Sequence, residues 1–103
     1  MSKPVERANF LEKAVNAIGK KYDLLILDSF LQNKGRRRFN QLLAAVPNIN
    51  PRILSMRLKD LEKNGLVSKT LVLGTPVKTE YQLNEKGESL HPLIEGLKAW
   101  AQK

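Results

Sequence analysis

The chain has 103 residues, a formal net charge of +8 at neutral pH, 42% hydrophobic residues and no cysteine. Its length suits one domain covering residues 1–103, and its apolar fraction is typical of a folded protein. Without cysteine, disulfides, zinc–thiolate sites, iron–sulfur clusters and cysteine redox sensing are excluded, and His91 alone cannot hold a metal. We expect no cofactor. No apolar run approaches the ~20 residues of a membrane-spanning helix, so a soluble, cytoplasmic protein is expected.

The positive charge is concentrated in the middle of the chain. Residues 36–64 carry seven basic and two acidic residues, so this segment holds +5 of the total charge of +8. Concentration of charge on one segment is typical of a nucleic-acid-binding surface. We therefore expect a polyanionic partner.

Two helices are predicted before this basic segment. Leu11, Val15 and Ile18 recur at the spacing of an amphipathic helix over about residues 5–18. Residues 22–31 are apolar nearly all round, which predicts a helix buried in the middle of a small domain.

A brief strand and a third helix are predicted next. Residues 36–39 form a run too short for a helix, and we expect a short strand there. Asn40 is expected to cap a helix over residues 41–46, because its side chain can accept a hydrogen bond from the free N–H groups at a helix start.

The clearest local signal is a helix over residues 51–64. Asn50 suits the N-cap, Pro51 suits the first helical position, and Gly65 suits a left-handed helix end. At about 100° per residue, the leucines of this segment share one face. The opposite face gathers Arg52, Met56, Lys59 and Lys63. One face is predicted to pack and the other to be cationic.

A β-hairpin is predicted after this helix. Residues 66–73 and 77–83 are rich in β-branched residues or alternate between apolar and polar residues, as strands do. The tripeptide Gly74-Thr75-Pro76 between them is a turn signal.

A last helical region is predicted over residues 85–102. Asn84 is expected to cap it, and Pro92 should kink or restart it, because proline removes one backbone hydrogen bond. The complete order of elements predicts a mainly α fold with a small β-hairpin. Two helices joined by a short turn, with a basic second helix and a hairpin (the wing, about residues 66–83) behind it, form a winged helix-turn-helix.

The residues also carry a family resemblance, which extends from Ile18 to Trp100. The chain resembles the HxlR-type family of winged helix transcriptional regulators. The segments that carry the likeness are Ile18–Tyr22 leading into Leu24–Leu27, Arg37–Leu42, Val46–Leu54, Arg57–Val67, Val77–Leu83, and Gly87 through Pro92 to Trp100. The resemblance implies a homodimeric DNA-binding regulator whose terminal helices, about residues 5–18 and 85–102, form the dimer contact.

The sequence departs from that family in three places. Many members carry a cysteine before the first helix, used by some as a redox or electrophile sensor, whereas Ser2–Val5 contains none. Tyr22 stands where a tryptophan is usual, which we interpret as a core variation. The hairpin tip Gly74-Thr75-Pro76 has no Arg or Lys, which argues against strong insertion of the wing into the minor groove.

The helix over residues 51–64 is the predicted recognition helix. Arg and Lys can donate to guanine acceptors, and Met can contact a thymine methyl group. A solvated helix face is the alternative interpretation. Arg57 lies at the edge of the leucine face, so a phosphate contact and an ion pair with a neighbouring acid both stay open. The candidate DNA-binding residues of this segment are Asn50, Arg52, Ser55, Met56, Arg57, Lys59 and Lys63.

Further candidate contacts lie beside this helix. Arg36, Arg37 and Arg38 could clamp phosphates, but successive side chains of a strand point to opposite faces, so at most two can face DNA together. A nuclear localisation signal is an alternative use of the three arginines. Lys69 and Lys78 flank the wing and are candidate phosphate contacts, with a plain solvated hairpin as the alternative.

A dimer seam is predicted from the apolar stripes of the terminal helices. A monomer of this size would have difficulty covering both terminal helices and the buried helix over residues 22–31. Packing of the two ends within one chain is the alternative. The candidate interface residues are Phe10, Leu11, Val15, Leu90, Leu93, Ile94, Leu97 and Trp100.

These patterns favour a sequence-specific regulator that binds double-stranded DNA as a homodimer at a palindromic operator. Repression is the commoner outcome in the family it resembles. A non-specific architectural DNA-binding protein and a winged helix used only for protein–protein contact are the alternatives. No nucleophile elbow, Walker loop or dinucleotide-binding glycine pattern occurs, so an enzyme is not expected. A small-molecule effector is compatible with the sequence, but no polar cluster announces one.

Overall fold

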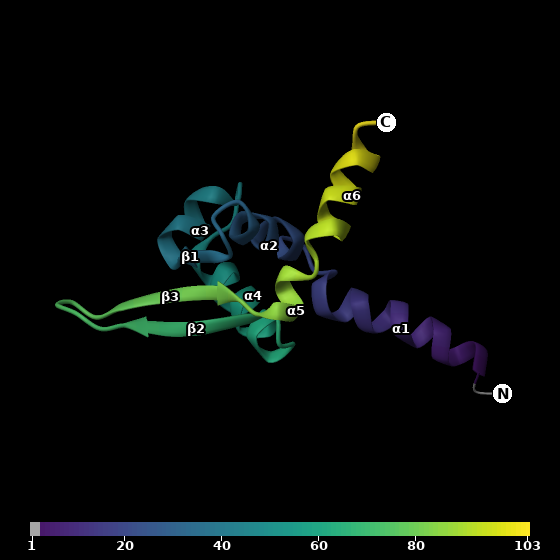
Figure 1. The fold of residues 1–103 in the computed structure, drawn as a ribbon, viewed down its shortest axis with the longest axis horizontal. Helices are drawn as coiled ribbons and strands as arrows, with labels where there is room; N and C mark the ends of the chain where they lie inside the picture. The colour runs from purple at the N-terminus through teal and green to yellow at the C-terminus, as the bar shows by residue number, and fades with distance from the viewer. Residues whose placement is uncertain (1–2) are drawn as a thin grey trace.

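The computed structural model describes the backbone of residues 3–103 (Figure 1). Most of it is helical, with one small antiparallel sheet. In chain order the elements are α1 (Lys3–Ile18), α2 (Asp23–Leu31), β1 (Arg36–Arg38), α3 (Phe39–Ala45), α4 (Pro51–Lys63), β2 (Val67–Val72), β3 (Lys78–Leu83), α5 (Glu85–Glu88) and α6 (His91–Ala101). Within this part of the chain, no helix is both long enough and apolar enough to span a membrane.

The core is built around α2, as its nearly uninterrupted apolar sequence predicts. Helices α2, α3, α4 and α6 and strands β2 and β3 each add at least one buried apolar side chain to the core, and Ile18 at the end of α1 packs against it. The buried apolar residues are Ile26, Leu27, Phe30, Leu42, Val46, Leu54, Leu58, Leu61, Leu66, Val67, Tyr81, Leu83 and Ile94. Burial of this set is the main stabilising contribution to the fold.

The sheet has three strands in the order β1-β3-β2, all antiparallel. Tyr81 of β3 pairs with Arg37 on one side and with Lys69 on the other. The brief strand and the hairpin predicted from the sequence are both confirmed. Their union in one sheet was not predicted, because a run of three arginines carries no apolar pattern that would indicate its partner.

The predicted cap of α3 is wrong. We expected Asn40 to precede the helix, but α3 begins at Phe39 and Asn40 lies in its first turn. Arg38 occupies the N-cap position, and its backbone N–H donates to Oε1 of Gln41 over 2.8 Å. Because the Gln41 side chain reaches back to this N–H group, the helix starts two residues earlier than a cap at Asn40 would place it.

The region after the hairpin is divided into two helices. The short α5 ends at Glu88 and α6 begins at His91, so the predicted restart of the helix near Pro92 is confirmed. Asn84 precedes α5 as predicted, but its side chain does not cap it. Instead the Asn84 amide donates to the Gly65 carbonyl over 3.2 Å and accepts from Ser68 Oγ over 2.5 Å. Asn84 therefore ties the two ends of the hairpin together.

Three elements extend away from the core. The wing formed by β2 and β3 points to one side, α1 points to the other, and α6 leaves the core in a third direction (Figure 1). A helix–turn–helix made by α3 and α4, followed directly by this hairpin, is a winged helix-turn-helix. The fold predicted from the sequence is therefore confirmed.

Candidate nucleic-acid interface

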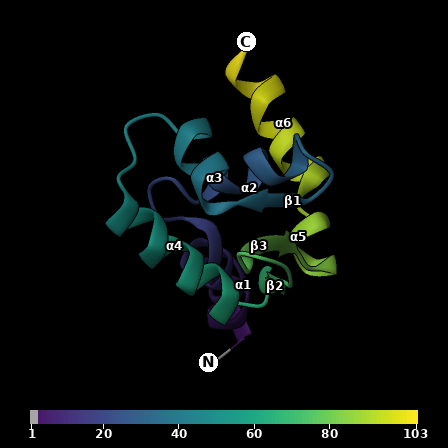
Figure 2. The same cartoon turned by 90° about the vertical axis from the view of Figure 1, so that its left-hand side faces the viewer.

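Helix α4 has the two faces that its sequence predicts. Leu54, Leu58 and Leu61 are buried against the core. The opposite face is solvent-exposed and carries Arg52, Ser55, Met56, Lys59 and Lys63. Figure 2, which looks along the wing, shows α4 on the outside of the molecule, beside the hairpin and below α3. A cationic helix face is thus presented to solvent, and no element of the described part of the chain covers it.

The start of α4 is fixed by local hydrogen bonds. Oδ1 of Asn50 accepts the Ile53 N–H over 2.8 Å, which confirms the predicted N-cap. Gly65 follows the helix with a φ of 76°, a left-handed conformation that glycine adopts at low cost. Because the Asn50 oxygen is engaged in the cap, its role in the structure is to hold the helix start.

The turn between α3 and α4 is tied to α2 by a residue that the sequence assigned to the core. The Tyr22 hydroxyl donates to the carbonyl of Asn48 over 3.2 Å. Asn48 has a φ of 63°, which asparagine tolerates better than most residues. Tyr22 is half-buried, so it positions the turn as well as packing beside the core.

Arg57 is engaged inside the protein. Its Nη1 lies 3.4 Å from Oδ1 of Asp23, and its Nη2 is paired with Asp60. Only 11% of the Arg57 side chain and 1% of Asp23 are exposed. Of the two roles that the sequence left open for Arg57, the structure shows the ion pair.

Asp23 is a buried carboxylate whose environment opposes its charge. Burial raises the pKa of Asp23 above its ordinary value of 3.8, and this effect exceeds the opposing influence of Arg57. The carboxylate also accepts the backbone N–H of Lys20 over 3.1 Å. No pattern in the sequence indicated that this acid at the start of α2 would meet α4.

The three arginines of β1 divide between the two faces of the strand. Arg36 and Arg38 are exposed, whereas Arg37 is half-buried and its Nε donates to the Ser29 carbonyl over 2.9 Å. The expectation that at most two of them share a face agrees with this arrangement. Arg37 is held against α2 and is not part of an outward clamp.

A shallow groove of about 460 Å³ lies between the start of α3 and the wing. It brings together Arg38 and Lys78, which the sequence named separately, and adds Asn40 and Gln41, which it did not name as contacts. Lys69 is exposed on β2. The wing tip is apolar, with 84% of Leu73 and 55% of Val77 exposed. Positive charge therefore lies on the two strands of the wing, at Lys69 and Lys78, and the turn between the strands carries none.

Comparison with known proteins agrees with this geometry. The model of the HxlR-like helix-turn-helix family matches residues 17–103. The chain belongs to this family. Among curated relatives, the HTH-type transcriptional regulator YvaP of Bacillus subtilis strain 168 is 41% identical over 90 residues, which cover 87% of this chain and 82% of YvaP. YodB, another HTH-type transcriptional regulator of that strain, is 34% identical, and the match covers 90% of this chain and 81% of YodB.

Solved structures of the family have the same fold. A putative HTH-type transcriptional regulator, ytcD, superimposes with a TM-score of 0.81 at 32% identity, over 89% of this chain and 92% of that one. Relatives of this HxlR-like protein are named as transcriptional regulators and not as enzymes.

Two apolar surfaces of this HxlR-like protein face solvent. On α1, Phe10 and Leu11 are about 70% exposed and Val15 is 53% exposed. On α6, Leu93, Leu97 and Trp100 are exposed by 48%, 41% and 71%. These six residues, which we call the arm surface, all belong to the set predicted to form the dimer seam, and the seam itself stays a prediction.

Two residues of the predicted seam lie elsewhere. Ile94 is only 4% exposed and belongs to the core cluster, and Leu90 is half-buried against it. Helix α6 therefore has two apolar sides, about 100° apart at 100° per residue. The sequence analysis assigned both sides to one apolar stripe, because the spacing of apolar residues does not show which side packs within the chain.

Proposed function

We propose that this protein is a sequence-specific transcriptional repressor that binds a palindromic operator in double-stranded DNA as a homodimer. The exposed cationic face of the capped helix α4, set beside the wing, is the observation that carries the proposal. In this proposal residues 1–103 form one DNA-binding domain, and the protein works at chromosomal DNA in the cytoplasm.

The outer face of α4 enters the major groove. Arg52 and Lys59 donate to guanine acceptors or to adjacent phosphates, and Met56 contacts a thymine methyl group. Ser55 and Lys63 lie on the same exposed side and extend the contact along the groove. The support is that these side chains project from one side of a rigid helix whose other side is fixed in the core.

Phosphate contacts flank the helix. Arg36 and Arg38 on β1, and Lys69 and Lys78 on the wing, are exposed, and Arg38 and Lys78 line the groove at the start of α3. Their charges neutralise the DNA backbone on either side of the groove, which gives affinity without sequence information. Arg37, Arg57 and Asn50 are left out of the contact set, because the chain itself uses their polar groups.

The dimer forms through the arm surface. Three large apolar side chains are exposed on α1 and three on α6, and exposed apolar surfaces on a soluble domain are typical of protein interfaces. Gly96 lies on the same side of α6, and a Cβ atom there would meet nothing within 4 Å. Since nothing in the described part of the protomer requires glycine at this helical position, close approach of a second helix is a reason for it.

Two recognition helices related by a two-fold axis read two half-sites. Such half-sites lie about one helical turn apart, ~34–36 Å along the DNA. Occupancy of a promoter by the dimer blocks access of polymerase, which is the physical basis of repression in this proposal.

The experiment is selection of bound duplexes from a random library, with a scrambled version of the winning sequence as the control. We expect an enriched palindrome that is bound at least ~10³-fold more tightly than the scrambled duplex. Equal, salt-dependent binding of both duplexes would instead identify an architectural protein. Absence of DNA binding would indicate a winged helix used for protein contact. A reporter under the selected operator tests repression, and increased expression on adding the protein would refute it.

A further inference from the structure

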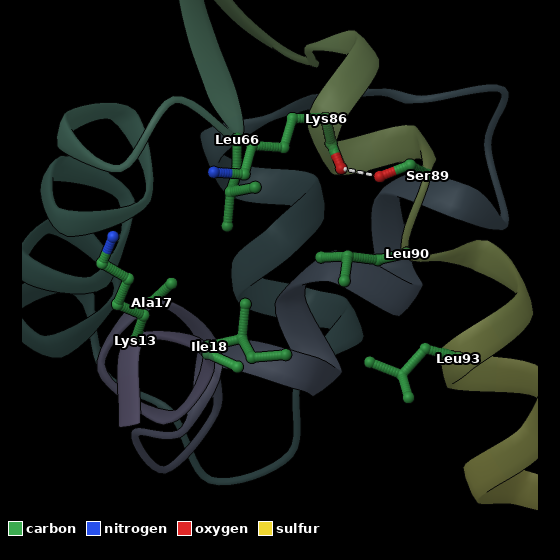
Figure 3. Close-up of a pocket in the computed structure, with 9 residues that line it drawn as sticks. Lys13, Ala17, Ile18, Leu66, Lys86, Ser89, Leu90 and Leu93 are labelled. Atoms are coloured by element: carbon green, nitrogen blue, oxygen red, sulfur yellow. Dashed lines mark hydrogen bonds between the residues drawn. The ribbon is translucent and has the colours of Figure 1, made fainter. Parts of the chain in front are cut away.

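A cavity of about 230 Å³ lies between α1, the root of the wing and the α5–α6 segment (Figure 3). Its walls are apolar and come from three separate parts of the chain. They are formed by Ala14, Ala17, Ile18, Leu66, Leu90 and Leu93. The Ser89 hydroxyl at the edge of the cavity donates to the Lys86 carbonyl over 2.5 Å. Its proton is therefore engaged in a hydrogen bond within the chain.

Two lysines give the cavity its charge. Lys13 on α1 and Lys86 on α5 both line it, and none of the lining residues in the described part of the chain is acidic. Both side chains are solvent-exposed, and Figure 3 shows both extending toward the left of the view, Lys13 from α1 and Lys86 from α5. Lys13 also lies over the Phe10 ring, with Nζ 5.9 Å from its centroid. The cavity thus combines an apolar interior with a positively charged rim.

We propose that this cavity is a binding site for a small organic anion with an apolar body, such as an aromatic monocarboxylate. An apolar cavity of ~150 Å³ admits benzene, so 230 Å³ has room for one ring and its substituent. The ring displaces water from the apolar walls, and the carboxylate stays at the rim between the two ammonium groups. A neutral ligand gains only the first of these interactions, and a cation is repelled.

The position of the site gives it a regulatory consequence, which rests on the proposed function. Leu66 directly follows Gly65 at the end of α4, and its N–H donates to the Leu61 carbonyl over 3.0 Å. The same cavity is lined by Lys13 and Ala17 on α1 and by Leu93 on α6. A ligand can fit one arrangement of α1, α6 and α4 better than another. Such a ligand shifts the protein toward the arrangement that it fits, and so changes the affinity for DNA.

Calorimetric titration of the protein without DNA tests the site, with benzoate as the probe and benzamide and benzylamine as its neutral and cationic analogues. We expect benzoate to bind with a Kd of about 1 mM or tighter, benzamide more weakly, and benzylamine not at all. Because DNA is absent, failure here is distinguishable from failure of the proposed function. No binding of benzoate, or equal binding of benzoate and benzamide, would overturn the proposal.

Three variants locate the binding. Lys13→Gln with Lys86→Gln should weaken benzoate binding about three- to tenfold without changing benzamide binding, as expected for exposed ionic contacts. Lys103→Gln, which removes a lysine outside the cavity, is the matched control and should bind like the wild type. Ala17→Leu fills the cavity and should abolish binding of both ligands, provided that its circular dichroism spectrum is unchanged.

The alternative is that an apolar side chain of a second copy of the chain fills this cavity. In that case the wild type would bind no benzoate, and Ala17→Leu would dissociate the dimer in sedimentation velocity, which would overturn the ligand proposal. In the expected case, saturating benzoate changes the Kd for the selected operator by about fivefold or more, and Ala17→Leu removes this response. Binding of benzoate that persists in Ala17→Leu would also overturn the assignment of the site.

Discussion

The guanidinium of Arg57 lies 3.4 Å from the carboxylate of Asp23, and this contact joins the middle of α4 to the first residue of α2. Asp60, one turn further along α4, is paired with the same guanidinium. Since α2 is the centre of the core, the ion pair adds a polar tie to the leucine contacts that fix the angle of α4. The ion pair orients the exposed face of that helix, although neither residue belongs to the proposed DNA contact set.

Loss of the arginine should destabilise the protein. Arg57→Met leaves Asp23 buried without its ionic partner, and we expect the free energy of unfolding at neutral pH to fall by about 3 kcal/mol. Urea unfolding followed by circular dichroism measures this change. The double variant Asp23→Asn with Arg57→Met removes the orphaned charge and should recover part of the loss. Equal stability of Arg57→Met and the wild type would show that the ion pair does not stabilise α4.

Asp23 should also give the stability a defined pH dependence. Burial raises the pKa of Asp23 in the folded protein, so the folded state holds this proton to a higher pH than the unfolded chain does. Its contribution is fully present below the ordinary pKa of 3.8 and is lost as the pH rises through the folded-state pKa. Between pH 4 and 7, the stability of the wild type should therefore fall relative to that of Asp23→Asn. Glu85→Gln, at an exposed position, is the control; a relative gain for the wild type would contradict the account.

Gly87 should resist substitution because α5 packs against the root of the wing. A Cβ atom at this position would lie 2.4 Å from the carbonyl oxygen of Leu66, a backbone atom that cannot move aside alone. Gly87→Ala should lower the free energy of unfolding by about 1–3 kcal/mol, as overpacking does. Glu85→Ala on the same short helix is the matched control and should change it little. Thermal unfolding of the two variants compares them, and a Gly87→Ala protein as stable as the control would refute this close packing.

The arm surface should control the oligomeric state. Leu97→Glu or Trp100→Glu places a charge in the proposed seam, and we expect either variant to sediment as a monomer where the wild type is a dimer. Ala99→Glu adds the same charge on another side of α6 and should leave the dimer intact. Monomeric variants should keep weak binding to a half-site and lose the tight binding to a palindrome. A wild type that is monomeric at every concentration tested would remove the basis for the dimer.

Local signals in the sequence predicted most of the fold. The cap at Asn50, Pro51 at the helix start and the left-handed Gly65 act within a few residues of one another, so their effect on α4 does not depend on the remaining structure. The α3 cap shows the limit of such signals. Asn40 and the Arg38–Gln41 pair both offer a helix start, and the pairing of Arg38 with Glu80 in the sheet favours the earlier one.

The candidate site was predictable where it depends on one helix and not where it depends on contacts between elements. The exposed face of α4 follows from its leucine spacing. The engagement of Arg57 by Asp23, residues 34 positions apart, depends on how α4 crosses α2. Likewise, Ile94 and Leu97 have the same apolar character, and only the docking of α6 on α2 decides which of them is buried.

The central claim is that the outer face of α4 reads DNA. The most direct measurement is fluorescence anisotropy of the selected operator and its scrambled control, titrated at several salt concentrations with the wild type and with Arg52→Ala, Lys59→Ala and Lys103→Ala. We predict that Arg52→Ala and Lys59→Ala reduce the preference for the operator by ~1–3 kcal/mol where a base contact is lost, or lower the salt slope by about one where a phosphate contact is lost. Lys103→Ala should behave like the wild type. Unchanged operator affinity and salt dependence in both α4 variants would contradict the account.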